Sequence, residues 1–209
     1  MMKTIGKISI IFLLIVGMFA CELPDNVDPK SPREVPTSTL VSNAQRYLGD
    51  YVSAQNFNIQ INRFLVRYWT EVTYLTEVRY DFSDRSIPDN WWHVLYRNAL
   101  KDFKEAENQI NETEFLPAEQ GIKSNQLAIV DISQVYIWHL LVETFGNIPY
   151  SEALDPDNAT PVYDDAETIY RDLIDRLTAS IGMIDESSGS FDDADLFYGG
   201  NASMWKTFA

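Results

Sequence analysis

The chain has 209 residues, of which 45% are hydrophobic and 13% aromatic, and its formal net charge at pH 7 is −15. This apolar content suffices for a buried core and argues against general disorder. The acidic balance would repel phosphate backbones and excludes a nucleic-acid binder, while a single cysteine excludes an internal disulfide and a cysteine zinc cluster.

The N-terminus has the pattern of a bacterial secretion signal. Lys3 and Lys7 precede an apolar run over residues 8–20. This run is shorter than the about 20 residues that a membrane-spanning helix needs. Cys21 follows this run directly and is the only cysteine. We therefore expect residues 1–20 to be a lipoprotein signal peptide and Cys21 to be the lipid anchor. An ordinary signal peptide with an incidental cysteine is the alternative.

Residues 21–37 hold four prolines among polar residues, which stiffen the chain and disfavour a helix. This segment is expected to tether the anchor to a helical domain over residues 38–209. Apolar residues recur there at three- and four-residue spacing, which predicts amphipathic helices. No convincing strand alternation appears, so the predicted fold class is all-α. The predicted helices cover approximately residues 38–52, 55–80, 88–110, 119–145, 164–184 and 201–209.

Several of these helices carry specific expectations. The helix over 55–80 places Phe64 and Tyr68 on one buried stripe. The helix over 119–145 is apolar nearly all round, which indicates a central position, and Gly146 should end it. Asp164 should cap the next helix. The predicted core includes Ile132, Trp138, Leu141, Leu173 and Leu177. Consecutive helices of this kind favour antiparallel, tetratricopeptide-like pairs, although no clean 34-residue period is visible.

No motif for catalysis or metal binding stands out. A glycine-rich phosphate loop, a nucleophile elbow and an H-E-x-x-H helix are all absent from the sequence. His139 and Glu143 have helical i, i+4 spacing and are interpreted as a core histidine with its partner. The acidic stretches 155–158 and 192–195 lack the pattern of a calcium loop and are interpreted as solvated loops. We expect no enzymatic activity, no cofactor and no metal.

Three stretches carry a more specific pattern: Trp91–Tyr96 (WWHVLY), Phe145–Leu154 (FGNIPYSEAL) with Pro161–Asp164 (PVYD) and Ile169–Tyr170, and Phe197–Asn201 (FYGGN) with Trp205–Ala209 (WKTFA). Together they resemble the SusD/RagB family of outer-membrane lipoproteins from Bacteroidetes. That family has F-G-D-x-P-Y-x-E-A, then P-x-Y-D, and later Y-G-G-D-x-x-x-W-x-K-F-A. Asn147 departs from the usual Asp, and Arg176 stands where an Asp would precede Leu177.

The resemblance implies the N-terminal part of a longer SusD-like protein, truncated at its C-terminal end. It implies a nutrient-binding lipoprotein on the exterior of the outer membrane, which captures oligosaccharides or peptides. Its partner would be a SusC-like TonB-dependent transporter, on which it acts as a lid. A helical-repeat scaffold that binds another protein is the alternative, and a secreted hydrolase is less favoured.

The segment between the second and third predicted helices is the expected ligand site. Tyr80, Arg85, Asn90 and Trp91 lie there, and aromatic faces with amide and guanidinium donors are typical of carbohydrate capture. In the family, the loop before the corresponding helix can contribute to the ligand site. The competing interpretation is that Trp92 continues the core stripe and Trp91 covers a neighbouring helix.

Overall fold

The computed structural model describes residues 35–53, 60–73, 75–82 and 86–209, and Val35–Ala209 form one compact unit. The predictions for the signal peptide, for most of the tether, for Cys21 and for Arg85 fall outside these described residues. Helices dominate the described chain, and the only sheet within it pairs two antiparallel strands of two residues each, β1 (Ile148–Pro149) and β2 (Tyr163–Asp164). The all-α prediction is confirmed.

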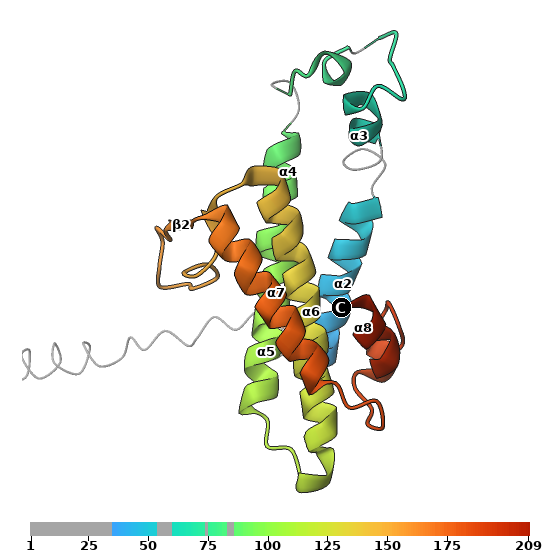
Figure 1. Cartoon of the computed structure of the whole chain (residues 1–209), viewed down its shortest axis with the longest axis vertical. Helices are drawn as coiled ribbons and strands as arrows, with labels where there is room; N and C mark the ends of the chain where they lie inside the picture. Colours follow the sequence, from blue (N-terminus) through green and yellow to red (C-terminus); the bar gives the residue numbers. More distant parts are fainter. Residues whose placement is uncertain (1–34, 54–59, 74, 83–85) are drawn as a thin grey trace, which may run out of the picture. The chain divides into compact units, whose positions relative to one another are not determined.

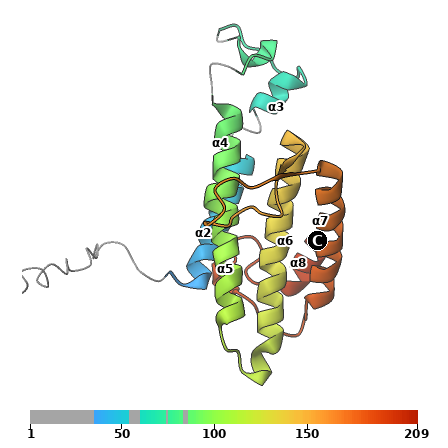
Figure 2. The same cartoon turned by 90° about the vertical axis from the view of Figure 1, so that its left-hand side faces the viewer.

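The long helices form an antiparallel array around one central helix. They are α2 (Thr37–Ser53), α5 (Lys101–Glu112), α6 (Gln120–Phe145) and α7 (Ala166–Met183). In Figures 1 and 2, α6 stands between α5 and α7, and the chain reverses direction from each of these helices to the next. The short helix α8 (Ala202–Phe208) packs on α6.

The helix α6 forms the middle of the core because it is apolar on nearly every side. Ile132, Trp138 and Leu141 are buried on it, Leu173 is buried on α7, and Leu177 is half-buried, in agreement with the predicted core. The segment Pro117–Phe145, which includes α6 and the 3₁₀ turn η4 (Pro117–Glu119), is long and apolar enough to cross a membrane. Since 61% of its most apolar window is buried, however, its composition is explained by the protein core.

The predicted helix over 88–110 is one continuous helix with an unexpected centre. α4 (Ile87–His93) passes through a π-helical stretch, η3 (Val94–Leu100), into α5. Within this π-helical stretch the buried residues recur five positions apart, from Val94 to Ala99 and from Leu95 to Leu100. This spacing fits the wider π turn, and a purely α-helical prediction could not anticipate it.

The prediction of a helix over 55–80 is wrong in its extent. α3 (Gln60–Leu65) ends early, and only a 3₁₀ turn, η2 (Glu77–Arg79), follows. Arg67 adopts a left-handed φ of 58°, and the N–H groups of Tyr68 and Trp69 both turn back to the carbonyl of Arg63. The chain therefore reverses after α3, and Tyr68 becomes 83% exposed instead of buried.

The helix ends are capped largely as expected, with one correction. Gly146 has a φ of 75°, and its N–H donates to Val142 at 2.8 Å, so it ends α6 as predicted. Asp165, not Asp164, caps α7, and it accepts a bond from the N–H of Thr168 at 3.1 Å. Asp164 is held in β2 by other hydrogen bonds and is therefore not available as the cap.

Candidate functional site

The segment containing α3 and η2 presents three exposed aromatic side chains. Tyr68, Trp69 and Tyr80 are 83%, 47% and 50% exposed. Large rings are usually mostly buried in folded proteins, because each carries a large apolar area. Three of them within one short segment form an exposed aromatic patch, which makes the segment a candidate binding surface.

Two arginines fix the positions of two of these rings. The guanidinium carbon of Arg63 lies 4.3 Å from the centroid of the Trp69 ring, and that of Arg67 lies 5.5 Å from the Tyr80 ring. Arg67 Nε also donates to the Tyr80 hydroxyl at 3.3 Å, and that hydroxyl donates to the carbonyl of Leu65 at 2.9 Å. The bond to Tyr80 raises the pKa of Arg67 further above its already high ordinary value. Its charge is therefore permanent. We call these five side chains, Arg63, Arg67, Tyr68, Trp69 and Tyr80, the aromatic surface.

The backbone holds this arrangement through two unusual residues. Arg67 and Tyr80 have φ angles of 58° and 62°, and a left-handed conformation is uncommon outside glycine. The two residues face each other across the aromatic surface. Both residues lie where a helical turn ends, since Tyr80 is the C-cap of η2 and Arg67 follows α3.

The predicted site residues fall into separate places. Tyr80 belongs to the aromatic surface, whereas Asn90 and Trp91 lie on α4, and Arg85 is outside the described residues. Asn90 is exposed and Trp91 is half-buried. Within the described part of the chain, no hydrogen bond or ring contact joins Tyr80 to Asn90 or Trp91. The indole nitrogen of Trp91 is buried and has no acceptor among the described residues, which makes it a donor without a partner.

Sequence reasoning missed most of the aromatic surface. Tyr68 lies on the periodic apolar stripe that predicted a buried helix face, and Trp69 follows it. The signal that was available is the pairing of two arginines with two aromatic residues within a short stretch, since Arg–aromatic pairs are common at exposed sites. Helical periodicity alone does not distinguish such a surface from a core.

Trp92 packs among the rings of the motif stretches. The centroid of its ring lies 4.6 Å from that of Tyr96, 5.1 Å from that of Phe145 in an edge-to-face arrangement, and 6.5 Å from that of Tyr163. The hydroxyl of Tyr96 donates to the carbonyl of Pro149 at 2.7 Å. The FGNIPY and PVYD stretches therefore pack against the helix that carries Trp91 and Asn90.

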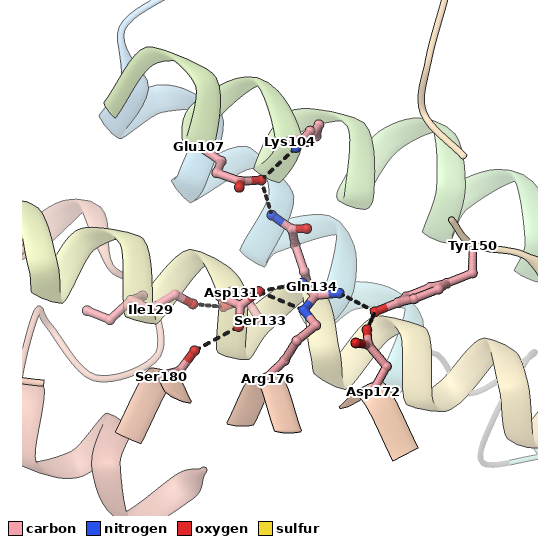
Figure 3. Close-up of polar contacts among 10 residues, drawn as sticks. All are labelled: Lys104, Glu107, Ile129, Asp131, Ser133, Gln134, Tyr150, Asp172, Arg176 and Ser180. Atoms are coloured by element: carbon pink, nitrogen blue, oxygen red, sulfur yellow. Dashed lines mark hydrogen bonds and ion pairs between the residues drawn. The ribbon is translucent and has the colours of Figure 1, made fainter. Parts of the chain in front are cut away.

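A polar network fixes the same motif loop to α7 (Figure 3). Arg176 donates to the Tyr150 hydroxyl at 2.8 Å and to Asp131 at 2.9 Å, and Ser180 donates to Asp131 at 2.7 Å. The Tyr150 hydroxyl donates to Asp172. Burial and this bond raise the pKa of Tyr150 to about 12, so the phenol stays protonated. Arg176, the departure from the family pattern, thus serves a structural contact.

A second set of polar contacts in Figure 3 joins α5 to α6. Lys104 pairs with Glu107 at 3.1 Å, and Gln134 donates to the same carboxylate at 3.4 Å. His139 and Glu143 form the predicted pair at 3.1 Å, but the His139 side chain is 36% exposed, so the interpretation as a core histidine is wrong. Among the residues that the structure describes, no group of three or more His, Cys, Asp or Glu side chains is arranged to hold a metal ion.

One acidic loop differs from expectation. Asp195, interpreted above as solvated, is only 2% exposed. Its Oδ1 accepts from Gln45 at 2.8 Å and from the N–H of Phe197 at 3.1 Å, and its Oδ2 accepts from the Trp205 indole at 2.6 Å and from the N–H of Gly200 at 2.9 Å. This buried carboxylate ties α2, the FYGGN loop and α8 together. The family motif in this region is therefore a structural clamp.

The antiparallel array with its two motif loops defines a SusD-like helical protein. A chitin-binding protein shares the fold with a TM-score of 0.64 at 24% identity, over 82% of this chain and 36% of that one. A SusD/RagB family protein from Bacteroides thetaiotaomicron aligns with a TM-score of 0.62 at 20% identity, over 84% of this chain and 36% of that one. A SusD-like protein from the same organism aligns with a TM-score of 0.59 at 19% identity, over 83% of this chain and 36% of that one. The chain thus spans just over one third of the length of these structures.

The sequence itself also matches a family. Residues 29–209 match the SusD-like family model described as "Starch-binding associating with outer membrane", and the chain belongs to this family. The resemblance stated from the three motif stretches is confirmed. No curated protein matches the chain.

Proposed function

We propose that this protein is a non-enzymatic nutrient-binding subunit that captures oligosaccharides on the aromatic surface. The observation that carries the proposal is the set of exposed rings at Tyr68, Trp69 and Tyr80, two of them held by arginines. The family description names starch binding, and one protein of the same fold is described as chitin-binding. Both descriptions support a glycan ligand over a peptide.

The chemistry of the surface suits a sugar ring. A pyranose has an apolar face that stacks on an aromatic ring, and hydroxyls at its edge that accept hydrogen bonds. The guanidinium of Arg63 lies over one face of the Trp69 ring. Trp69 is still 47% exposed, which leaves ring area for a ligand. Free N–H groups on Arg63 and Arg67 would donate to sugar hydroxyls. Because both rings are already positioned, little conformational entropy is lost on binding.

The α4 residues extend the proposed site. Asn90 supplies an exposed amide, and the half-buried ring of Trp91 supplies a further apolar face. Arg85 lies between these two groups of residues in the sequence and completes the set proposed from the sequence. Tyr80, Arg85, Asn90 and Trp91 therefore remain proposed ligand contacts.

The test is a binding panel on the complete protein with starch-derived and chitin-derived oligosaccharides and with peptides. Trp69→Ala should lower the affinity for the glycan at least tenfold, which corresponds to about 1.4 kcal/mol, with an unchanged melting temperature. Leu116→Ala is the control, since Leu116 is also a large apolar side chain, is 65% exposed on the turn before α6, and lies outside the aromatic surface. Unchanged affinity in Trp69→Ala, Tyr80→Ala and Trp91→Ala together would reject this surface as the site.

We also propose that Cys21 is the acylated first residue of the mature protein, after removal of residues 1–20, and that residues 21–37 are its tether. The family description places such proteins at the outer membrane, and acyl chains contribute about 0.8 kcal/mol per buried methylene. Cys21→Ala should then leave the detergent phase for the aqueous phase. Continued partition into detergent would contradict the anchor.

A TonB-dependent transporter is the proposed partner, and the exterior face of the outer membrane the proposed location. A small binding protein that captures a glycan outside the cell needs a channel to pass it on. Affinity purification of the complete protein from membranes should recover such a transporter. Protease added to intact cells should also digest the protein, and protection from that protease would contradict the exterior location.

A further inference from the structure

A polar hollow lies between α2, the helix that runs from η3 into α5, and the loop that joins β1 to β2. Its volume is about 580 Å³, within the range of about 300–1,000 Å³ that small-molecule sites have. The apolar part of its lining comes from Leu40, Tyr96, Leu154 and Pro156, and its other lining side chains are polar or charged. We call this hollow the polar groove.

One side of the polar groove is a row of hydrogen-bond donors. Arg97, Lys101 and Asn108 follow one another at four- and seven-residue spacing, which places them on one face of the helix. All three are exposed, and within the part of the chain that the structure describes no hydrogen bond or ion pair joins them to another side chain. These donors are therefore available to a ligand.

The groove holds as many acidic as basic side chains. Its lining includes three of each: Arg97, Lys101, Lys104, Asp102, Glu105 and Asp155. Asp102 accepts a hydrogen bond from Asn43 at 2.7 Å, and the charge of Lys101 also acts on it. A ligand of either charge would therefore meet like charges in the groove, which favours a neutral ligand with many hydrogen-bonding groups.

The loop that forms the other wall is held by its own hydrogen bonds. Asp155 Oδ1 accepts from the N–H of Asp157 at 2.9 Å. One carboxylate oxygen of Glu152 accepts from the Asn158 side chain at 3.0 Å and from the N–H of Val162 at 3.2 Å. Because the wall is already fixed, little conformational entropy is lost when a ligand enters.

We propose that the polar groove is a second glycan subsite, which takes a neutral sugar. A sugar hydroxyl both donates and accepts, so it suits a lining of cations, an amide and carboxylates. Leu154 and Pro156 offer apolar contact to the C–H groups of the ring. This inference rests on the proposed function, because it takes a glycan as the ligand, but it concerns a different surface.

The groove should bind more weakly than the aromatic surface. Its lining includes one aromatic ring, that of Tyr96, and Tyr96 is half-buried. Stacking on exposed rings, which the aromatic surface offers, therefore contributes less here. Two classes of site with different affinities are the expected result.

Isothermal titration calorimetry of the complete protein with maltohexaose and chitohexaose tests the subsite. Trp69→Ala should remove the tighter class of site and retain the weaker one. In that background, Arg97→Ala should weaken the residual binding at least tenfold with an unchanged melting temperature, and Asn108→Ala serves as a second variant. Arg171→Ala is the matched control, because the Arg171 side chain is 74% exposed on α7 and does not line the groove.

The outcomes separate this inference from the proposed function. A single class of site that Trp69→Ala removes and Arg97→Ala leaves unchanged would reject the groove and retain the aromatic surface. Binding that Arg97→Ala weakens and Trp69→Ala does not would support the groove and reject the aromatic surface. Binding of neither hexasaccharide would reject both. Tighter binding of tetragalacturonate than of the neutral glycans, lost in Arg97→Ala, would overturn the assignment of a neutral ligand.

Discussion

Replacing Asp195 by Asn tests whether one buried carboxylate holds α8 in place. The carboxylate accepts four hydrogen bonds, two on each oxygen, from Gln45, Phe197, Trp205 and Gly200. Asn keeps only one acceptor oxygen. Its amide NH₂ would then face two N–H donors, so two bonds are lost and two buried donors stay unpaired.

The expected loss of stability follows from these contacts. A hydrogen bond to a charged group contributes about 1.5–3 kcal/mol, so two such bonds amount to about 3–6 kcal/mol. Removing a buried charge recovers part of its desolvation cost. We therefore expect Asp195→Asn to lower the free energy of unfolding by about 3–5 kcal/mol. For a domain of this size, that corresponds to a fall of about 6–20 °C in the melting temperature.

Urea denaturation followed by circular dichroism at 222 nm gives the free energy of unfolding. Asp193→Asn is the matched control, because Asp193 lies two residues away and is exposed. Surface substitutions of this kind change stability by about 0.5 kcal/mol or less. A difference between the two variants thus reports the clamp rather than a loss of negative charge.

A double-mutant cycle identifies the partner that matters. Trp205→Phe removes the indole N–H that donates to Asp195 at 2.6 Å. In that background Asp195→Asn should cost about 1–3 kcal/mol less than in the wild type, since one unpaired donor is absent. A cost below about 1 kcal/mol in the wild type, or no coupling between the two positions, would refute the clamp.

Three further predictions concern stability. Gly200→Ala should lower the free energy of unfolding by at least about 1–2 kcal/mol, because φ is +74° and an added Cβ would lie 2.5 Å from a backbone nitrogen. Gly182→Ala on α7 is the control: its added Cβ meets no atom within 4 Å, so it should stabilise the protein slightly. Thermal melts of both variants check this. Leu173→Ala should cost about 2–5 kcal/mol in urea denaturation, since its side chain is buried in the core. Hydrogen bonds from Ser151 lower the pKa of Asp164. The ionised carboxylate therefore contributes to stability above its ordinary pKa, and this contribution is lost as the pH falls through the folded-state pKa. The free energy of unfolding measured between pH 5 and pH 2 should thus fall less steeply in Asp164→Asn than in the wild type.

The long helices were predictable because their burial follows a regular period. In the helix predicted over 88–110, the apolar residues Leu95, Ala99, Phe103, Ala106 and Ile110 are all buried. The near-continuous apolar sequence around Trp138 places α6 at the centre. Gly146 and the proline-rich connections mark the helix ends for equally local reasons. Tertiary contacts agree with local preference in these elements.

The candidate site was less predictable because its aromatic residues follow the same helical spacing as a buried apolar stripe. Tyr68 repeats at helical spacing from Phe64, yet Phe64 is 3% exposed and Tyr68 is 83% exposed. The difference arises at Arg67, whose left-handed conformation ends the helical continuation. Asp195 shows the opposite case, since its partner Gln45 is distant in the sequence and no local pattern reveals that contact.

The position of Trp92 relates the family motifs to the proposed site. Trp91 and Trp92 are neighbours on α4, but Trp92 is fixed by contacts with Phe145 and Tyr163, whereas the indole nitrogen of Trp91 has no partner among the described residues. The motif loops therefore contact α4 through Trp92, whereas Trp91 packs half-buried against the core. Contacts that hold one tryptophan rigidly reduce the entropy cost when a ligand meets the other. If α4 contributes to the proposed ligand site, the FGNIPY and PVYD motifs would serve that site by positioning α4 through Trp92.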